Sequence, residues 1–223
     1  MVSGALPAMK HLFAALTALA LTAACSNAPA TPEAATAFAA ATEPEAESRP
    51  TEYALIGQKL PAFTAPMADG GTFESATLNR WTVIAVWGVW CGDSRADGPY
   101  TAALDRAIAQ DPDLDFISIH VPSSPGSESR DMPFGKFGSL EAYFESAGYT
   151  LPVVLDTDGS VREALKINWT PSYLLVSPDG IVRSFQTDLS ADKDQPVKTY
   201  IKNVAETRKA VRDLLAPAPG DIE

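Results

Sequence analysis

The cysteine at position 91 stands where a predicted buried strand runs directly into a predicted helix. The strand is expected over residues 81–87, which are mostly apolar and rich in β-branched side chains, and Trp90 immediately precedes the cysteine. Gly92 follows it and opens a helix-forming segment. The first turn of a helix offers free N–H groups and the positive end of the helix dipole, and both favour a thiolate over a thiol. We therefore predict that Cys91 is a reactive nucleophile; the alternative is a buried, inert cysteine.

The segment W-C-G-D-S-R-x-x-x-P resembles the W-C-x-x-C-x-x-x-x-P active-site segment of thioredoxin-fold proteins, especially the envelope-located TlpA-type thiol–disulfide oxidoreductases. Trp90, Gly92 and Pro99 match that pattern, whereas Ser94 stands at the place of the family's second cysteine. In the family, the first cysteine attacks a disulfide and the second releases the substrate from the resulting mixed disulfide. A serine hydroxyl cannot make that second attack, so the resemblance implies a monothiol member.

Neighbouring residues modify this expectation. Asp93 places a negative charge beside the thiol and opposes the helix dipole, and Arg95 is expected to offset that charge or to pair with Asp97. Ala85 stands where thioredoxins carry a buried carboxylate that assists proton transfer. No histidine is evident as a base, because His120 is predicted to end a strand. Together these features predict a slower thiol than that of a dedicated oxidant.

A second stretch, I-N-W-T-P-S followed by an apolar strand and an S-P-D-G turn, adds to the resemblance. Thioredoxin-fold proteins carry a cis-proline before the strand that faces the active-site cysteine. By that resemblance Pro171 is the cis-proline, and the Thr170 backbone pairs with an extended substrate segment beside Cys91. Taken by itself, the motif favours a trans proline that starts a strand; beside the cysteine motif, we favour the cis-proline.

We interpret residues 1–24 as a signal peptide of the lipoprotein type. It has a short cationic start, an apolar stretch too short to span a bilayer, and small residues before Cys25. The L-T-A-A-C ending resembles a bacterial lipobox, which implies that Cys25 is lipidated, and Ser26 then favours the outer membrane. The alternative is ordinary cleavage after residue 24, which leaves Cys25 as a free thiol. We expect a protein held by its lipid on the periplasmic side of the cell envelope.

Residues 25–50 contain mostly Ala, Pro, Thr and Glu and cannot bury enough apolar surface to fold, so we expect a disordered tether. The folded domain is expected over residues 51–215, with residues 216–223 as a disordered, frayed tail. The resemblance implies an α/β domain of thioredoxin-like fold, with a central mixed β-sheet flanked by helices, an N-terminal β-hairpin and a TlpA-type insertion. The D-G-G turn at residues 69–71 supports the hairpin independently, because glycine allows positive φ between two apolar runs.

Hydrophobic periodicity predicts the remaining elements of the domain. Further strands and helices are expected at residues 115–121, 140–147, 151–155, 161–165 and 196–215. The helix after the cysteine and the C-terminal helix each carry an apolar stripe that we expect to be buried. The stripes comprise Tyr100, Ala103, Leu104 and Ile108 in the first helix and Val197, Tyr200, Ile201, Val204, Val211 and Leu214 in the second. The loop at 122–137 is long enough for a lid or a partner-contact surface, with a solvated connection as the simpler alternative.

The chain has 223 residues, a formal net charge of −11 and only two cysteines. This acidity argues against nucleic acid as a partner and against a polybasic grip on anionic lipid. If Cys25 is acylated, no intramolecular disulfide is possible. The expected partners are therefore protein or low-molecular-weight thiols and disulfides, including an external reducing thiol. Asp156 and Asp158 do not continue a calcium-loop pattern, and no metal or other cofactor is expected.

Three functions remain open from the sequence. The favoured one is a thiol–disulfide oxidoreductase that works through Cys91 alone. The second is a non-catalytic binding module that uses the groove and the Pro171 loop to hold a client or partner. The third is a one-cysteine peroxidase, which is less favoured because the usual peroxidatic threonine, three residues before the cysteine, is Gly88 here. C-G-D-S is also similar to the C-G-F-S of monothiol glutaredoxins that share an iron–sulfur cluster, but the preceding tryptophan and the signal peptide argue against such a protein.

Overall fold

The computed structural model describes residues 49–125, 127, 131–192 and 194–216 of the chain. The predicted signal peptide, Cys25, nearly all of the predicted tether and the tail from residue 217 lie outside the described residues. Within the described part of the chain, no helix is long and apolar enough to cross a membrane.

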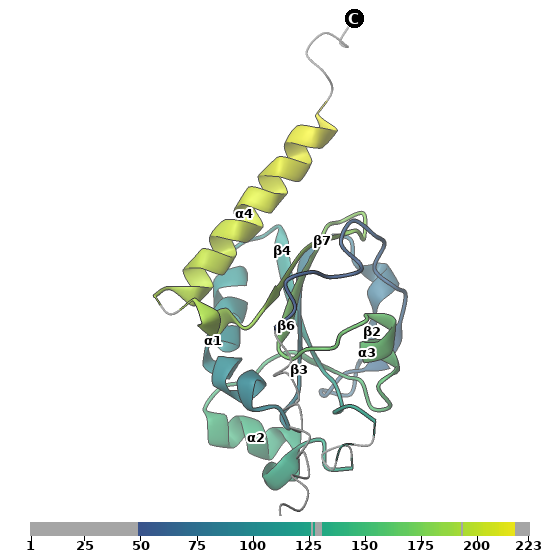
Figure 1. Ribbon diagram of the computed structural model, residues 1–223, viewed down its shortest axis with the longest axis vertical. Coiled ribbons are helices and arrows are strands. Elements are labelled where there is room, and N and C mark those ends of the chain that lie inside the picture. Colours follow the sequence, from purple (N-terminus) through teal and green to yellow (C-terminus); the bar gives the residue numbers. More distant parts are fainter. Residues whose placement is uncertain (1–48, 126, 128–130, 193, 217–223) are drawn as a thin grey trace, which may run out of the picture. The chain divides into compact units, whose positions relative to one another are not determined.

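A five-stranded mixed sheet organises the domain, in the order β5-β4-β3-β6-β7 (Figure 1). Its strands are β3 (Trp81–Trp87), β4 (Leu114–His120), β5 (Val153–Leu155), β6 (Ser172–Val176) and β7 (Val182–Thr187). β3, β4 and β5 run parallel, whereas β6 pairs antiparallel with both β3 and β7. The predicted mixed sheet is therefore confirmed, and the strand that leads to Cys91 lies at its centre.

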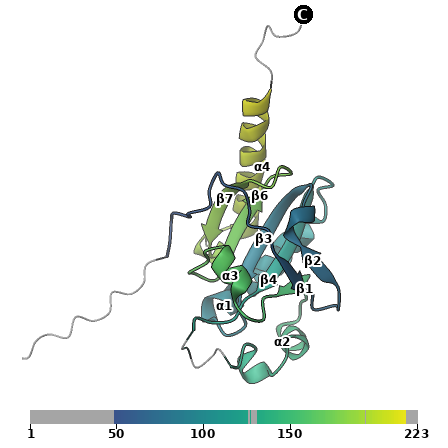
Figure 2. The same ribbon diagram turned by 90° about the vertical axis from the view of Figure 1, so that its right-hand side faces the viewer.

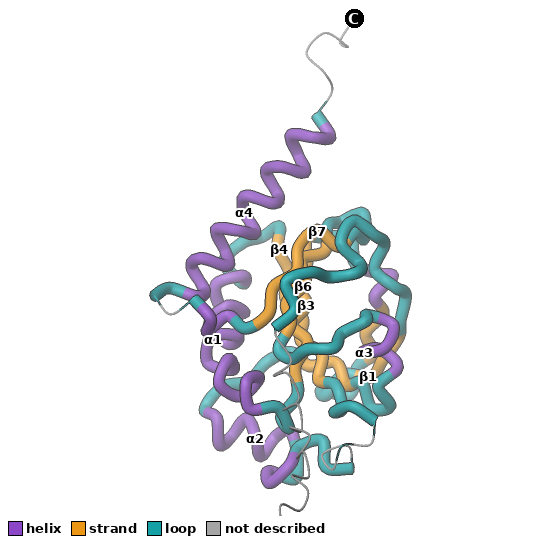
Figure 3. The backbone as a smooth tube through the Cα atoms, in the orientation of Figure 1, coloured by secondary structure: helices purple, strands orange, loops and turns teal. Residues whose placement is uncertain are grey.

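Helices cover both faces of this sheet. They are α1 (Gly92–Ile108), α2 (Leu140–Ala147), α3 (Ser160–Ala164) and α4 (Pro196–Leu215), with the 3-10 turns η1 (Ser75–Thr77), η3 (Gly135–Phe137) and η4 (Leu189–Ala191). α1 and α4 pack side by side on one face, and α3 lies on the opposite face (Figures 1 and 3). α2 lies at one end of the domain, where Tyr143 packs against Ala102 of α1 (Figure 2).

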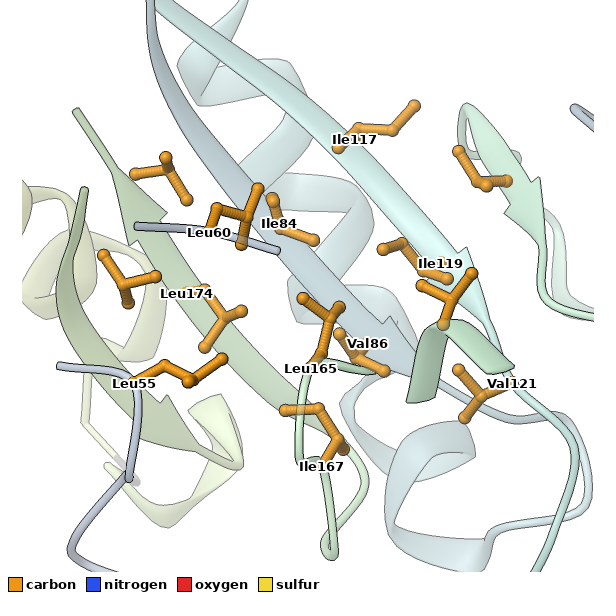
Figure 4. Close-up of a cluster of buried hydrophobic side chains, with 14 of the residues drawn as sticks. Leu55, Leu60, Ile84, Val86, Ile117, Ile119, Val121, Leu165, Ile167 and Leu174 are labelled. Atoms are coloured by element: carbon orange, nitrogen blue, oxygen red, sulfur yellow. The ribbon is translucent and has the colours of Figure 1, made fainter. Parts of the chain in front are cut away.

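The alternation of side chains along β3 explains how both faces are covered. Ile84 and Val86 point to the face where they pack with Leu165 (Figure 4). Val83 and Ala85 point to the other face and lie in the cluster beneath α1 and α4. A strand buried on both sides is an almost continuous apolar run, which is why the 81–87 segment could be recognised from its sequence.

The predicted N-terminal hairpin is confirmed. Its two short antiparallel strands are β1 (Thr64–Pro66) and β2 (Thr72–Glu74). In the turn, Gly70 has a φ of 90° and the Gly71 N–H donates to Asp69 Oδ1 at 3.0 Å, so the D-G-G sequence closes the hairpin. Met67, just beyond β1, forms a bridge to Val154 of β5 and so places the hairpin against the edge of the sheet.

The strands and helices predicted at 81–87, 115–121, 140–147, 151–155, 161–165 and 196–215 differ in their boundaries from those of the structure by at most two residues. Two residues of the predicted apolar stripes, however, are exposed. Tyr100 is 39% exposed, although Leu104 and Ile108, one and two turns further along the same face of α1, are buried. Leu214 is 83% exposed. The C-terminal end of α4 extends beyond the sheet, so nothing in the described part of the chain covers this leucine (Figure 1).

Candidate active site

Cys91 lies at the N-terminal end of α1, a short connection after β3. It is the N-cap residue of the helix, has an extended backbone (φ −85°, ψ 127°) and is partly exposed. Its thiol donates a hydrogen bond to the Thr170 carbonyl, with the sulfur and the oxygen 3.2 Å apart. The cysteine therefore stands at the start of a helix, as the sequence predicts.

The Thr170–Pro171 peptide bond is cis, in agreement with the resemblance. Thr170 is buried, and β6 begins immediately after the proline. Because β6 pairs antiparallel with β3, a carbonyl 79 residues away in the sequence reaches the thiol of Cys91. The two motifs singled out in the sequence thus meet in one place.

Ser94 occupies the place of the family's second cysteine and is buried, at 2% exposure. Its Oγ accepts a hydrogen bond from the Gly88 N–H at 3.3 Å. The hydroxyl therefore holds the connection that leads from β3 to the cysteine. Cys91 is the single cysteine among the described residues, and its thiol is free.

The Trp90 ring lies against Gly88, and a hydrogen bond and a cation–π contact hold the ring in place. A Cβ at residue 88 would come within 2.2 Å of Trp90 Nε1, so the tryptophan requires glycine there. The indole N–H donates to the Val121 carbonyl at 2.8 Å, and the Arg162 guanidinium lies 5.7 Å from the ring centroid. These contacts fix the residue that precedes the cysteine.

Arg95 has a different partner from those that the sequence suggested. Its Nη1 donates to the Val89 carbonyl at 2.6 Å, and its Nη2 would lie 4.0 Å from a Cβ at Gly92. The guanidinium therefore folds back over the start of α1. Asp93 is exposed on the first turn, whereas Asp97 is fully buried and bonded elsewhere, so the expected pairing of Arg95 with Asp97 is wrong.

His120 belongs to the site, although the sequence indicated only its place at the end of a strand. Its buried ring accepts a hydrogen bond from the Val89 N–H at 3.1 Å through Nε2, and it also bonds to the Pro133 backbone. The Trp87 ring packs edge-on, 5.3 Å away. Burial lowers the pKa of His120 to about 4, so the ring is neutral at pH 7 and can accept this bond. His120 thus positions the connection before the cysteine.

Asp97 fastens the site helix to the rest of the domain. Its carboxylate accepts hydrogen bonds from the Leu189 N–H at 2.6 Å, the Ser190 N–H at 2.9 Å and the Tyr173 hydroxyl at 3.0 Å. Tyr173 lies opposite Ala85 in the β3–β6 register. The resemblance places a buried carboxylate at residue 85 of β3. Here the buried carboxylate belongs to α1 instead, and it accepts a hydrogen bond from the tyrosine that lies opposite Ala85.

Asp188 is a second buried carboxylate that the sequence did not single out. Its Oδ2 accepts from Trp169 Nε1 at 3.1 Å and pairs with Arg49 Nε at 2.8 Å, while Oδ1 has no hydrogen-bond partner among the described residues. Burial raises the pKa of Asp188 to about 6, against the lowering effect of Arg49. Because Trp169 precedes Thr170, this carboxylate holds the loop that faces Cys91.

A cavity of about 310 Å³ opens beside the cysteine motif. Val89, Trp90 and Arg95 line one side of it, and residues of the 132–137 segment line the other. This segment is the end of the long loop predicted from the sequence. The loop therefore contributes a wall of the site.

The AhpC/TSA family model matches residues 56–185 of the chain. The chain belongs to this family. Thiol-disulfide oxidoreductase ResA of Bacillus subtilis is 24% identical over 127 residues, which cover 56% of this chain and 64% of ResA. A thioredoxin-like protein of Haemophilus influenzae is 26% identical over 125 residues, which cover 55% of this chain and 65% of that protein. The chain thus spans slightly less than two thirds of the length of these two relatives.

Solved structures of this AhpC/TSA protein's relatives agree on the fold. A thiol-disulfide oxidoreductase from Bacteroides fragilis superimposes with a TM-score of 0.50 at 15% identity, covering 66% of this chain and 99% of its own. A candidate protein disulfide isomerase from Bacteroides thetaiotaomicron gives a TM-score of 0.54 at 20% identity, covering 70% and 92%. The thioredoxin-like fold predicted from the sequence is therefore confirmed, as is the resemblance to thioredoxin-like oxidoreductases.

Proposed function

We propose that this chain is a thiol–disulfide oxidoreductase that works through a single nucleophilic cysteine, Cys91. The observation that carries the proposal is the position of the thiol, partly exposed at the start of α1 and 3.2 Å from the Thr170 carbonyl beside the cis peptide bond of Pro171. An extended substrate segment that pairs with the Thr170 backbone would present its disulfide to this sulfur. The similarity to ResA, a thiol-disulfide oxidoreductase, supports the reaction class.

The reaction consists of thiol–disulfide exchanges. The Cys91 thiolate attacks one sulfur of a substrate disulfide, a mixed disulfide forms, and the other substrate sulfur leaves as a thiolate. An external thiolate then attacks the substrate sulfur of the mixed disulfide, and Cys91 leaves as a thiolate. A second external thiol frees the substrate by the same exchange, so two external thiols are oxidised to one disulfide. The protein returns to its starting state.

The environment of Ser94 supports the need for an external thiol. Its hydroxyl is buried and accepts the Gly88 N–H, and an alcohol cannot displace a thiolate from a mixed disulfide. Cys91 caps the helix that begins at Gly92, so the sulfur belongs to a residue at the helix start. The Arg95 guanidinium folds back over this helix start and adds a positive charge there.

We also place this activity on the periplasmic side of the cell envelope, with the protein anchored in the outer membrane through a lipid on Cys25. The signal-peptide pattern of residues 1–24 and the cysteine that follows it support this placement. Residues 25–50 would act as the tether, residues 51–215 as the thioredoxin-like domain and residues 216–223 as a tail. Metabolic labelling with a radioactive fatty acid, compared with a Cys25→Ser variant, tests the anchor.

The activity is tested on the full chain carrying Cys25→Ser, in which Cys91 is the sole thiol. The alkylation rate is measured against pH for the native and the urea-unfolded chain, and mixed disulfides are trapped with a disulfide-bonded model peptide. The proposal requires faster labelling of the native chain below pH 8 and a mixed disulfide that an added thiol releases. The chain that also carries Cys91→Ser is the control and should show neither.

Two other outcomes would replace the proposal. A thiol that is labelled only in urea would indicate the non-catalytic binding module. Rapid consumption of hydrogen peroxide, with oxidation of Cys91 to a sulfenic acid, would indicate the one-cysteine peroxidase. Against the peroxidase, the Trp90 ring leaves no room at residue 88 for the threonine of the peroxidatic pattern, since even a Cβ would lie 2.2 Å from Trp90 Nε1.

A further inference from the structure

We propose that the cavity lined by Trp90 and Arg95 binds a low-molecular-weight thiol that carries a carboxylate, and that this molecule is the external thiol that resolves the mixed disulfide. Arg95 and Lys136 would bind its carboxylate. This inference rests on the proposed function, because only a protein that relies on an external thiol needs a place to hold one.

The cavity lies at the right place for this role. Trp90 and Arg95, which line it, flank Cys91 in the sequence. Arg95 is one helical turn beyond the cysteine, and its N–H donates to the Cys91 carbonyl at 3.2 Å. Residues one turn apart share a helix face, and the guanidinium extends back towards Gly92. Arg95 thus brings the cavity to the same helix start as Cys91, although Cys91 itself does not line the cavity.

The charge of the cavity selects an anion. Arg95 uses Nη1 for the Val89 carbonyl, and a guanidinium has further N–H donors with which to bind a carboxylate. Across the cavity, Lys136 is exposed, with its ammonium 5.2 Å from the centroid of the Phe137 ring. None of the described residues that line the cavity is acidic, although the chain carries a net charge of −11. Among the described residues, the cavity is therefore lined by two cations and no carboxylate, which gives it a positive charge within an acidic protein.

The size and apolar lining of the cavity favour a small molecule over a protein segment. A volume of about 310 Å³ lies at the lower end of the range for small-ligand pockets. Met132, Phe134 and Phe137 also line the cavity and supply apolar surface for the carbon chain of the thiol. A protein client would instead lie along the Thr170 backbone.

The bound thiol performs the second exchange of the proposed cycle. Its thiolate attacks the substrate sulfur in the mixed disulfide, so that a new sulfur–sulfur bond forms while the Cys91–substrate bond breaks. The bonding electron pair leaves on Cys91, which becomes a thiolate again, and the proton of the small thiol goes to solvent. A second molecule of the same thiol then releases the substrate and is oxidised with the first to a disulfide.

The experiment measures how fast different thiols release Cys91 from a neutral mixed disulfide. The full chain with Cys25→Ser is converted to the 2-hydroxyethyl disulfide of Cys91 and treated with 3-mercaptopropionate, 2-mercaptoethanol or cysteamine. Each rate is divided by the rate for the same thiol on the urea-unfolded chain, which removes differences in intrinsic thiol reactivity. We expect the native chain to prefer 3-mercaptopropionate over 2-mercaptoethanol by about five- to tenfold, and to lose this preference at high salt.

Two lysine variants test whether the preference for 3-mercaptopropionate arises in the cavity. Lys136→Gln should lower it at least twofold, whereas the control Lys198→Gln removes an equal charge from exposed α4 and should leave it unchanged. Equal normalised rates for all three thiols would overturn the inference and leave the proposed function standing. Release no faster than from the unfolded chain with any thiol, including a model peptide thiol, would count against the proposed function itself. An acidic peptide that contains one cysteine is tested in the same way. If only the release by this peptide depends on Lys136, the cavity binds protein clients and the inference is overturned.

Discussion

Acid should destabilise this domain through His120, whose neutral ring accepts the Val89 N–H at 3.1 Å. The perturbation is the substitution His120→Gln, compared with the parent chain between pH 7.5 and pH 4.5. Burial lowers the pKa of His120 from 6.5 to about 4, so in this range the unfolded chain binds a proton that the folded chain does not. The contribution of His120 to stability is therefore fully present above pH 6.5 and is lost as the pH falls towards 4.

The size of the effect follows from these two pKa values. By linkage, His120 lowers the unfolding free energy of the parent by about 1 kcal/mol at pH 5.5 and by about 2–3 kcal/mol at pH 4.5, relative to neutral pH. Asp188 acts in the opposite direction, because its pKa of about 6 means that the folded chain takes up a proton first. Since Asp188 titrates in both chains, the difference between the two chains isolates the contribution of His120.

Urea unfolding followed by tryptophan fluorescence gives the unfolding free energy of both chains at each pH. The stability of the parent relative to His120→Gln should fall by about 2–3 kcal/mol between pH 7.5 and pH 4.5. A difference that stays constant with pH would refute the reasoning, because it would mean that His120 binds protons alike in the folded and unfolded chains.

Other predictions concern the helix start and the buried carboxylates. A Cβ at residue 98 would lie 1.9 Å from the Tyr149 hydroxyl, so Gly98→Ala should lower the unfolding free energy by about 1–3 kcal/mol. Adding Tyr149→Phe should recover part of that loss, and strictly additive effects in urea would contradict the contact. Asp188→Asn should gain stability relative to the parent as the pH rises from 5 to 8, because only the parent must ionise a buried carboxylate; a pH-independent difference would rule out its raised pKa. Ser94→Cys should form a disulfide with Cys91 on oxidation, and two thiols that both remain free would show that the position is unsuited to a second cysteine.

The features predicted correctly from the sequence are those that a run of consecutive residues determines. The apolar run Trp81–Trp87 followed by Cys91 specifies a strand and a helix start locally, and the Pro171 motif became informative only beside it. Leu214 shows the limit of this approach. Periodicity tells which side chains share a helix face, whereas burial depends on whether another element reaches that face, and the end of α4 extends past the sheet.

The features that the sequence did not reveal depend on contacts between distant residues. The bond from the Val89 N–H to His120 spans 31 residues, and the bond from the Leu189 N–H to Asp97 spans 92. An isolated histidine or aspartate in a sequence resembles any solvated one. Arg95 was assigned to neighbouring acids because side-chain charge is visible in a sequence, whereas its actual partner is a backbone carbonyl, a group that every residue carries.

The sulfur of Cys91 and the carbonyl that faces it belong to residues 79 positions apart, so Cys91 is synthesised well before the backbone that its thiol contacts. While the chain emerges from the ribosome, β3 has been made but β6, which must pair with it, has not. The newborn chain therefore passes through a stage in which the thiol exists without the Thr170 backbone that would choose its substrates. If Cys91 has the proposed reactivity, its thiol can meet unselected partners until the last strands have joined the sheet.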